Sequence, residues 1–328
     1  MTQKHSKSTV TRRRFMIMAS ALGALPAMPV AAFALNGGMQ SVNWTGAALG
    51  AEASIRLFHH DPEWARRQLD RCQQEINRLE SLFSLYRPNS EICRLNADGH
   101  LDNPDIEFLN LLSLAKSFSQ QTNGLFDVTV QPLWKLYVDH FSREHADPAG
   151  PSSSEITAVL GTVGSSKINL TAGRIGFEKP GMAITLNGVA QGYITDRIAV
   201  LLKSAGFDNV LVSLGENYAL GGKPDGNPWR VGILSPEDGK TIATTVDLAN
   251  KALATSGGHG SPFTSHSTAN HLLNPLTGRY AEFKRSVSVT SPSATLADMA
   301  STALSFMTDE DGRKFISRLP LIEDVIYG

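Results

Sequence analysis

A carboxylate and a hydroxyl, those of Asp298 and Thr302, stand four residues apart in "SATLADMASTALSFM" (293–307), a stretch rich in small and apolar residues. If this stretch is a helix, Asp298 and Thr302 lie on the same face, because side chains at positions i and i+4 lie one above the other. A carboxylate and a hydroxyl are ligands that a hard cation such as Mg²⁺ prefers. A solvated helix face, with a hydroxyl bonded to the preceding turn, would give the same pattern. The spacing therefore leaves a metal site and a plain polar face both open.

Three further stretches are too polar or too rich in glycine for a plain core: "SLYRPNSEICRLN" (84–96), "NGLFDVTVQPLW" (123–134) and "TLNGVAQGY" (185–193). The first exposes Tyr86 beside a Pro-Asn turn, and the second places Asp127 just ahead of an expected short strand. The third carries Gly188 and Gly192 at an expected turn between a strand and a helix. Such a turn lets the backbone approach a phosphate, and the following helix N-terminus favours anions. An ordinary tight turn would carry the same glycines, so the motif alone is a weak signal.

Histidines occur in two loops further along the chain. "LATSGGHGSPF" (253–263) and "NHLLNPLTG" (270–278) contain His259 and His271, and His266 lies between the two loops. Such loop histidines can be surface, structural or catalytic residues. The sequence contains no serine elbow, paired CxxC or HExxH motif. It therefore lacks the common signatures of serine hydrolases and zinc enzymes.

The elements that must position these side chains follow from the apolar pattern. Helical spacing predicts helices over residues 62–83, 104–120 and 192–206, and strand patterns occur at 209–215, 229–234 and 286–290. The polar segment 142–155 is the best candidate for an insertion or a domain boundary. Helices and strands do not alternate regularly, which favours an α+β fold over a doubly wound one. We expect a single compact domain of mixed helices and mainly antiparallel sheet.

The first 34 residues predict an export signal. They combine a basic start and an apolar run with the small-residue end Ala32-Phe33-Ala34, which is the layout of a cleaved signal. Within them, "TRRRFM" (11–16) has the form of a twin-arginine signal. Two prolines and a glycine interrupt the apolar run, so we expect no permanent membrane span. We expect residues 1–34 to be removed and the mature chain, residues 35–328, to be periplasmic.

The charge of the chain argues against one class of function, and its cysteines allow one possible disulfide. The whole chain carries 30 basic and 31 acidic residues, and the signal contains basic residues but no acidic ones. The mature chain is therefore acidic, which argues against nucleic-acid binding. Cys72 and Cys93 are the only cysteines. They could form one disulfide in an oxidising compartment, although Cys72 also fits the apolar stripe of a helix.

Taken in order, these stretches resemble the ApbE family of flavin transferases (FAD:protein FMN transferases). The resemblance runs from about Ala48 to the end of the chain. It rests on the motifs "YRPNSEICRLN", "NGLFDVT", "LNGVAQGYITD", "SGGH" with "NHLLNPLTG", and "SVTSPSATLADMASTALSFM". The "LNGVAQGY" form, together with the twin-arginine signal, looks most like the NosX-like subgroup associated with nitrous-oxide reduction, which modifies a membrane-bound flavoprotein.

The resemblance implies a set of site residues. Mg²⁺ would be bound by Asp298, Thr302 and the backbone carbonyl of Gly188. Tyr86 would stack on the isoalloxazine ring of FAD. Other residues implied at the FAD site are Leu49, Leu125, Phe126, Asp127, Thr185, Gln191 and His271. The proton of the acceptor hydroxyl would pass to Asp298, to His271 or to a water.

Some positions depart from the family pattern. Thr185 and Gln191 stand where many members carry Asp and Lys, and Asn274 replaces the Asp of a His-x-x-Asp-Pro loop. Leu49-Gly50-Ala51 stands in place of Met-Gly-Thr. Losing one acid and one base together preserves the local charge balance. We therefore expect a subgroup variant and not an inactive copy.

The resemblance implies Mg²⁺-dependent transfer of the FMN part of FAD to a Thr or Ser hydroxyl, with release of AMP. The acceptor would be a membrane-bound or periplasmic flavoprotein. Two alternatives use the same site: an FAD pyrophosphatase that forms FMN and AMP, and a non-catalytic periplasmic protein that binds and delivers FAD. The presence of both Asp298 and Thr302 favours an enzyme.

Overall fold

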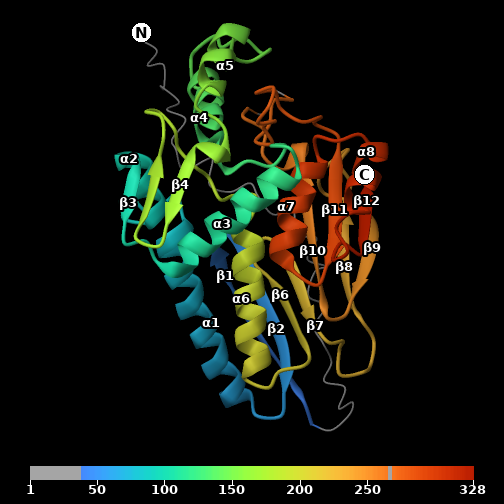
Figure 1. Cartoon of the computed structure of the whole chain (residues 1–328). Coiled ribbons are helices and arrows are strands. Elements are labelled where there is room, and N and C mark those ends of the chain that lie inside the picture. The colour runs from blue at the N-terminus through green and yellow to red at the C-terminus, as the bar shows by residue number, and fades with distance from the viewer. Residues whose placement is uncertain (1–37, 265–267) are drawn as a thin grey trace, which may run out of the picture.

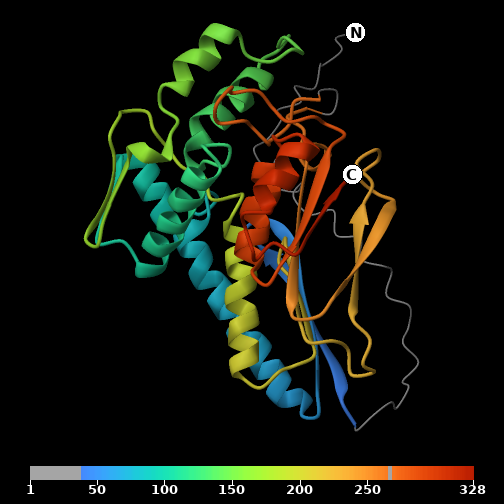
Figure 2. The same ribbon diagram turned by 45° about the vertical axis from the view of Figure 1, so that its right-hand side comes forward.

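The computed structural model describes residues 38–264 and 268–328. The expected export signal, residues 1–34, lies outside the described residues, as does His266. Figure 1 and Figure 2 show long helices on one side of a large sheet and a separate two-stranded hairpin on the other side. The expectation of mixed helices and sheet in one domain is confirmed.

The main sheet in the described chain has seven strands in the order β1-β2-β6-β7-β10-β11-β12. Their bounds are β1 Gln40–Ala48, β2 Ala51–His59, β6 Val210–Ser213, β7 Asn217–Leu220, β10 Lys251–Gly257, β11 Ser286–Ser291 and β12 Asp324–Tyr327. Every neighbouring pair is antiparallel, as expected. The strands predicted at 209–215 and 286–290 correspond to β6 and β11. Since β2 pairs with β6 and β7 with β10, the segments between these strands lie outside the sheet.

Three helices cover one face of this sheet: α1 (Pro62–Phe83), α6 (Ala190–Ser204) and α7 (Ala294–Leu304). α1 packs on β1 and β2, α6 lies between α1 and α7, and α7 packs on β10 and β11. The buried side of α1 includes Leu69, Cys72 and Ile76, which is the stripe that the helical spacing predicts. The predicted helices at 62–83 and 192–206 are therefore confirmed, with α6 beginning at Ala190.

The remaining helices and a small sheet gather beyond one end of this layer (Figure 1). The helices are α2 Glu91–Asp98, α3 Ile106–Gln121, α4 Gln131–Phe141 and α5 Ser153–Leu160, and the sheet has the order β3-β5-β4, with β3 His100–Asp102, β5 Arg174–Phe177 and β4 Ile168–Thr171. A last helix, α8 (Asp309–Ile316), follows α7. The polar segment 142–155 leads from α4 into α5, and these two helices pack together. Residues 142–152 are therefore a loop within the domain, and residues 153–155 form the start of α5.

The hairpin of β8 (Trp229–Leu234) and β9 (Ile242–Leu248) forms a separate two-stranded sheet. Trp229 is 2% exposed, and its ring lies 6.0 Å from that of Phe58 on β2. Leu248 and Leu253 belong to the same apolar cluster. This burial holds the hairpin against the face of the main sheet that the long helices leave open.

Two local expectations were wrong. The strand expected after Asp127 is a 3₁₀ turn, Val128–Val130, that leads directly into α4. The Asp127 side chain accepts a hydrogen bond from the backbone N–H of Thr129, as a helix cap does. The segment before α6 is irregular and not a strand, so the glycine turn joins a loop to a helix.

Two further predictions concern the membrane and the cysteines. In residues 38–264 and 268–328, no helix has both the length and the apolar character that crossing a bilayer requires. Cys72 and Cys93 are both free thiols, so the possible disulfide is not formed. Cys72 is buried in the core, and burial raises the pKa of its thiol to about 12.

Candidate active site

Asp298 lies in the middle of α7, where this helix meets α6. Its side chain is 3% exposed, and Oδ2 accepts a hydrogen bond from the backbone N–H of Gly192 at 3.0 Å. The helices are so close that a Cβ at Gly192 would lie 2.4 Å from the carbonyl oxygen of Ala294. The interpretation of Asp298 as part of a solvated helix face is therefore wrong. It is a buried carboxylate between two helices.

A second acid, Asp196 on α6, fixes the start of α7. Its carboxylate accepts hydrogen bonds from the backbone N–H groups of Ala294 at 2.7 Å and Thr295 at 2.9 Å. It also accepts from the hydroxyls of Ser293 at 2.8 Å and Thr295 at 2.6 Å. An acid at a helix N-terminus bonds the free N–H groups and interacts favourably with the helix dipole. Asp196 thereby sets the position of α7, and with it that of Asp298.

Thr302 lies one turn after Asp298, beside the glycine turn. A Cβ at Gly188 would lie 3.0 Å from Thr302 Oγ1, so the lack of a side chain there lets the turn approach the hydroxyl. On β10, the hydroxyl oxygen of Ser256 lies 3.4 Å from Thr302 Oγ1 and 2.8 Å from Ser301 Oγ. The carboxylate, the hydroxyl and the glycine turn therefore meet at one place.

These oxygens fit a small hard cation. The structure records no hydrogen bond from any described residue to Asp298 Oδ1, so one oxygen of this buried carboxylate is left for another partner. Among all the described residues, no three His, Cys, Asp or Glu side chains come together as possible metal ligands. With the ligands that the family resemblance implies, Asp298, Thr302 and the Gly188 carbonyl, a bound cation would have one carboxylate and neutral oxygens from the chain. It would complete its shell with water or phosphate, as Mg²⁺ commonly does.

Burial controls the protonation of Asp298. Burial and, to a smaller extent, the negative charge of Asp196 together raise the pKa of the carboxyl group to about 7, against the opposing effect of the Gly192 N–H. A cation beside the carboxylate would favour the ionised form. Metal binding at this position would therefore release a proton at neutral pH or below.

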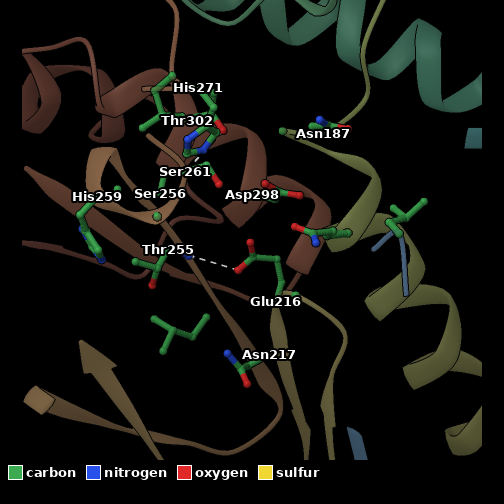
Figure 3. Close-up of a pocket in the computed structure, with 18 of the residues that line it drawn as sticks. Asn187, Glu216, Asn217, Thr255, Ser256, His259, Ser261, His271, Asp298 and Thr302 are labelled. Carbon is green, nitrogen blue, oxygen red and sulfur yellow. Dashed lines mark hydrogen bonds between the residues drawn. The ribbon is translucent and has the colours of Figure 1, made fainter. Parts of the chain in front are cut away.

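Glu216 is a second buried acid that the sequence did not reveal as a site residue. Its side chain is 7% exposed, and Oε2 accepts a hydrogen bond from the backbone N–H of Thr255 at 3.1 Å. Figure 3 shows its carboxyl group in the same cavity as Asp298. Burial raises the pKa of Glu216 well above its usual range, and the charge of Asp298 adds to this. Glu216 occupies the hairpin tip between β6 and β7, a position where a charged side chain is usually exposed.

One cavity of about 570 Å³ is lined by all of the site residues that the family resemblance implies. They are Leu49, Tyr86, Leu125, Phe126, Asp127, Thr185, Gly188, Gln191, His271, Asp298 and Thr302. The cavity is also lined by residues that the sequence did not single out, among them Asn187, Asn217, Ser256 and Ser261, and by the loop histidine His259 (Figure 3). The fold therefore brings together side chains from β2, β7, β10, α6, α7 and the intervening loops.

Tyr86 and Asp127 contribute to this cavity in different ways. Tyr86 is 47% exposed and offers an open aromatic ring at the cavity wall. Asp127 Oδ1 accepts hydrogen bonds from the N–H and the hydroxyl of Thr129, and Oδ2 accepts from Ser119 Oγ and the N–H of Ser165. Its carboxylate is thus occupied by contacts within the protein, which tie its loop to α3 and to Ser165. Asp127 acts mainly by holding the neighbouring apolar residues in place.

His271 is a neutral residue in this environment. Burial lowers the pKa of its ring to about 4, and its backbone N–H donates to the carbonyl oxygen of Ser261 at 3.1 Å. Among the described residues, His271 Nδ1 has no hydrogen-bond partner. The following turn keeps its shape with Asn274 in place of Asp, because Asn274 Oδ1 accepts from the N–H groups of Leu276 and Thr277. The ring can therefore accept a hydrogen bond or a proton.

Thr185 and Gln191 stand where the family pattern has an acid and a base. Both make neutral contacts in this structure. The N–H of Thr185 donates to the carbonyl oxygen of Val128 at 2.8 Å, and its hydroxyl accepts from the N–H of Asn187 at 3.2 Å. The amide of Gln191 packs on Gly215, where a Cβ would lie 2.5 Å from it. Both residues line the cavity wall.

Comparison with known proteins agrees with this architecture. The sequence profile of the ApbE family matches residues 49–326. A Vibrio cholerae protein named FAD:protein FMN transferase is 27% identical over 283 residues, which is 83% of each chain. The solved structure named flavin transferase ApbE from Vibrio cholerae is 25% identical, with a TM-score of 0.74 over 88% of this chain and 93% of that one. The ApbE protein of Thermotoga maritima is 27% identical, with a TM-score of 0.74 over 88% of this chain and 94% of that one.

Proposed function

This chain belongs to the ApbE family, and we propose that it transfers the FMN part of FAD to a Thr or Ser hydroxyl of an acceptor protein in a Mg²⁺-dependent reaction. The relatives named FAD:protein FMN transferase support this activity. The observation that carries the proposal is the meeting of Asp298, Thr302 and Gly188 at one edge of a cavity that also holds Tyr86. An aromatic surface and an oxygen-rich cation site in one cavity match the two ends of FMN.

The proposed reaction is a phosphoryl transfer. The acceptor hydroxyl oxygen forms a bond to the phosphorus on the FMN side of the FAD pyrophosphate. The bond from this phosphorus to the bridging oxygen breaks, and AMP leaves with that oxygen. A bound Mg²⁺ would neutralise negative charge on the phosphate oxygens. The chain itself holds the reactants and provides an acceptor for the hydroxyl proton.

Asp298 and His271 are the side chains proposed to receive this proton, with water as the alternative. His271 is neutral and has an unpartnered ring nitrogen, so it can accept a proton without first losing one, but burial, which lowers its pKa to about 4, makes it a weak base. Asp298 has one free oxygen, although metal binding would compete for it. A role for either residue requires the acceptor hydroxyl within hydrogen-bond reach.

The remaining lining residues would bind and orient FAD. Tyr86 would stack on the isoalloxazine ring, because its ring is half exposed and free to face a planar ligand. Leu49, Leu125 and Phe126 would add apolar contacts, and Asp127 would hold the loop that carries Leu125 and Phe126. Thr185 and Gln191 would form neutral polar contacts.

The proposal includes where the protein works. Residues 1–34 would form a cleaved twin-arginine signal, and residues 35–328 the periplasmic flavin transferase domain. The form of the glycine turn and the arginine signal support membership of the NosX-like subgroup associated with nitrous-oxide reduction. The acceptor would then be a membrane-bound or periplasmic flavoprotein.

One experiment separates this activity from its two alternatives. The purified mature chain is incubated with FAD and MgCl₂, with and without a candidate acceptor. AMP together with a covalently fluorescent acceptor identifies a transferase. AMP together with free FMN in the absence of acceptor identifies a pyrophosphatase, and intact FAD throughout identifies a binding or delivery protein.

A further inference from the structure

The turn between β1 and β2 has an unusual residue in it. Leu49 and Gly50 form a two-residue hairpin loop, since Ala48 pairs with Ala51. Both loop residues have positive φ, +48° at Leu49 and +83° at Gly50. Such a turn matches the twist of the two strands, but its first position favours Asn, Asp or Gly. A leucine in this left-handed conformation is strained and needs support from its surroundings.

Glu80, in the last turn of α1, provides this support. The backbone N–H of Leu49 donates to Glu80 Oε1 at 2.6 Å, across 31 positions of sequence. A hydrogen bond from an N–H to a carboxylate is short and strong compared with one between neutral groups. Glu80 is partly buried, with 12% of its side chain exposed. The bond fixes the tip of the hairpin against α1.

The other oxygen of Glu80 holds a second loop. Arg87 donates through Nη2 to Glu80 Oε2, and also donates to the backbone carbonyl and the side-chain oxygen of Asn77 at 3.2 Å and 3.0 Å. Arg87 is the residue next to Tyr86, whose backbone N–H donates to Ser84 Oγ at 3.2 Å. One carboxylate thus joins the loop that carries Leu49 to the loop that carries Tyr86.

Both of these loops contribute to the cavity wall, but Glu80 and Arg87 do not. Leu49, Gly50 and Tyr86 line the cavity. We propose that Glu80 is a positioning residue, which sets the relative placement of Leu49 and Tyr86 and thereby shapes the surface that binds the flavin ring. This inference rests on the proposed function, because it takes FAD as the ligand of the cavity.

The test measures binding of FAD and the quenching of its fluorescence, well below the unfolding temperature of each variant. Stacking on Tyr86 quenches flavin fluorescence, so quenching reports the position of this ring and not only occupancy. Glu80→Gln should weaken FAD binding about tenfold and reduce quenching at saturation. Glu63→Gln is the matched control, since Glu63 is on the same helix and forms an exposed ion pair with Arg66. It should bind and quench like the parent.

A second variant covers the case in which Glu80→Gln does not fold. Arg87→Gln leaves the bond between Leu49 and Glu80 in place and releases only the Tyr86 loop, so it should also reduce quenching. If both substitutions act through the carboxylate of Glu80, the double variant should lose less affinity for FAD than the sum of the losses in the two single variants. Parent-like affinity and quenching in a folded Glu80→Gln, or in Arg87→Gln where Glu80→Gln does not fold, would overturn the inference. A parent that does not bind FAD at all would instead contradict the proposed function.

Discussion

The backbone N–H of Gly192 on α6 donates to the carboxylate of Asp298 on α7 at 3.0 Å. The contact exists because residue 192 has no side chain, which allows the two helices to approach. The glycine that the sequence suggested as a phosphate-turn residue therefore serves the acid directly. The tight helix crossing and the position of the buried carboxylate depend on each other.

Gly192→Ala should separate the two helices. The added Cβ would lie 2.4 Å from the carbonyl oxygen of Ala294 and 2.9 Å from Asp298 Cβ, so backbone must move. We expect a loss of about 1–3 kcal/mol in the free energy of unfolding, measured by urea denaturation. Gly173→Ala is the control, because a Cβ there meets nothing within 4 Å. Equal stabilities of the two variants would show that the crossing is looser than the structure describes.

Asp298→Asn should abolish flavin transfer while the fold is kept. The amide oxygen can still accept from the Gly192 N–H, but the cation would lose the only carboxylate among its proposed ligands. We expect activity to fall at least about a hundredfold, measured as covalent flavin on an acceptor peptide by in-gel fluorescence across a Mg²⁺ titration. Glu310→Gln, on the exposed surface of α8, should behave like the parent. Normal transfer by Asp298→Asn at low Mg²⁺ would remove the metal site from the proposal.

Tyr86→Ala should affect FAD binding more than chemistry. A stacked ring contributes contact area and aromatic geometry worth about 1 kcal/mol or somewhat more, so the Kd for FAD should rise about tenfold. Tyr86→Phe keeps the ring and should be mild. Calorimetry gives both values. If Tyr86→Ala bound FAD as tightly as the parent, this residue would be an ordinary exposed tyrosine.

The export prediction concerns the residues before the described chain. Changing Arg12 and Arg13 together to Lys should leave the precursor in the cytoplasm, because the signal is read by a receptor that requires the pair. Arg14→Lys, outside the pair, is the control and should be exported. Cell fractionation followed by immunoblotting measures the distribution. Periplasmic delivery of the double variant would contradict the twin-arginine assignment.

Periodicity predicted the helical layer well because those helices bury one regular face. α1 follows its apolar spacing from Pro62 to Phe83, and its start coincides with a proline at the first turn and an Asp cap. The same reasoning failed after Asp127. "VTV" is rich in β-branched residues, but the capping carboxylate and the following proline favour a helical turn, and these local bonds outweigh strand propensity.

The sequence predicted the site residues that lie in recognisable motifs. It did not predict the features of the site that arise only from tertiary contacts. All the residues implied by the family resemblance line one cavity. The burial of Asp298 was not apparent, because a charged residue in a helix is usually exposed and only the crossing at Gly192 covers it. Glu216 was missed for the same reason. Its carboxylate is placed by the backbone N–H of Thr255, which is 39 positions away in the sequence and donates to it.

The buried ring of His271 predicts how stability depends on pH. Its pKa is lowered by burial from 6.5 to about 4 in the folded chain, while the unfolded chain keeps the ordinary value. Between these values the unfolded state binds more protons than the folded state, so this residue makes the protein less stable as the pH falls from about 6.5 to about 4. Above that window the residue contributes no pH dependence.

His271→Asn removes this dependence, because an amide does not titrate. The free energy of unfolding should be measured by urea denaturation of both proteins, without FAD, from pH 7 to pH 4.5. The substitution itself changes packing, which shifts the variant by a constant amount at every pH. Relative to its value at pH 7, the parent should lose roughly 2–3 kcal/mol more than the variant at the acid end. The other histidines titrate in both proteins and cancel in the comparison. A difference between parent and variant that stays constant across this range would mean that the ring of His271 is hydrated or charge-paired in the folded state, and that burial does not lower its pKa.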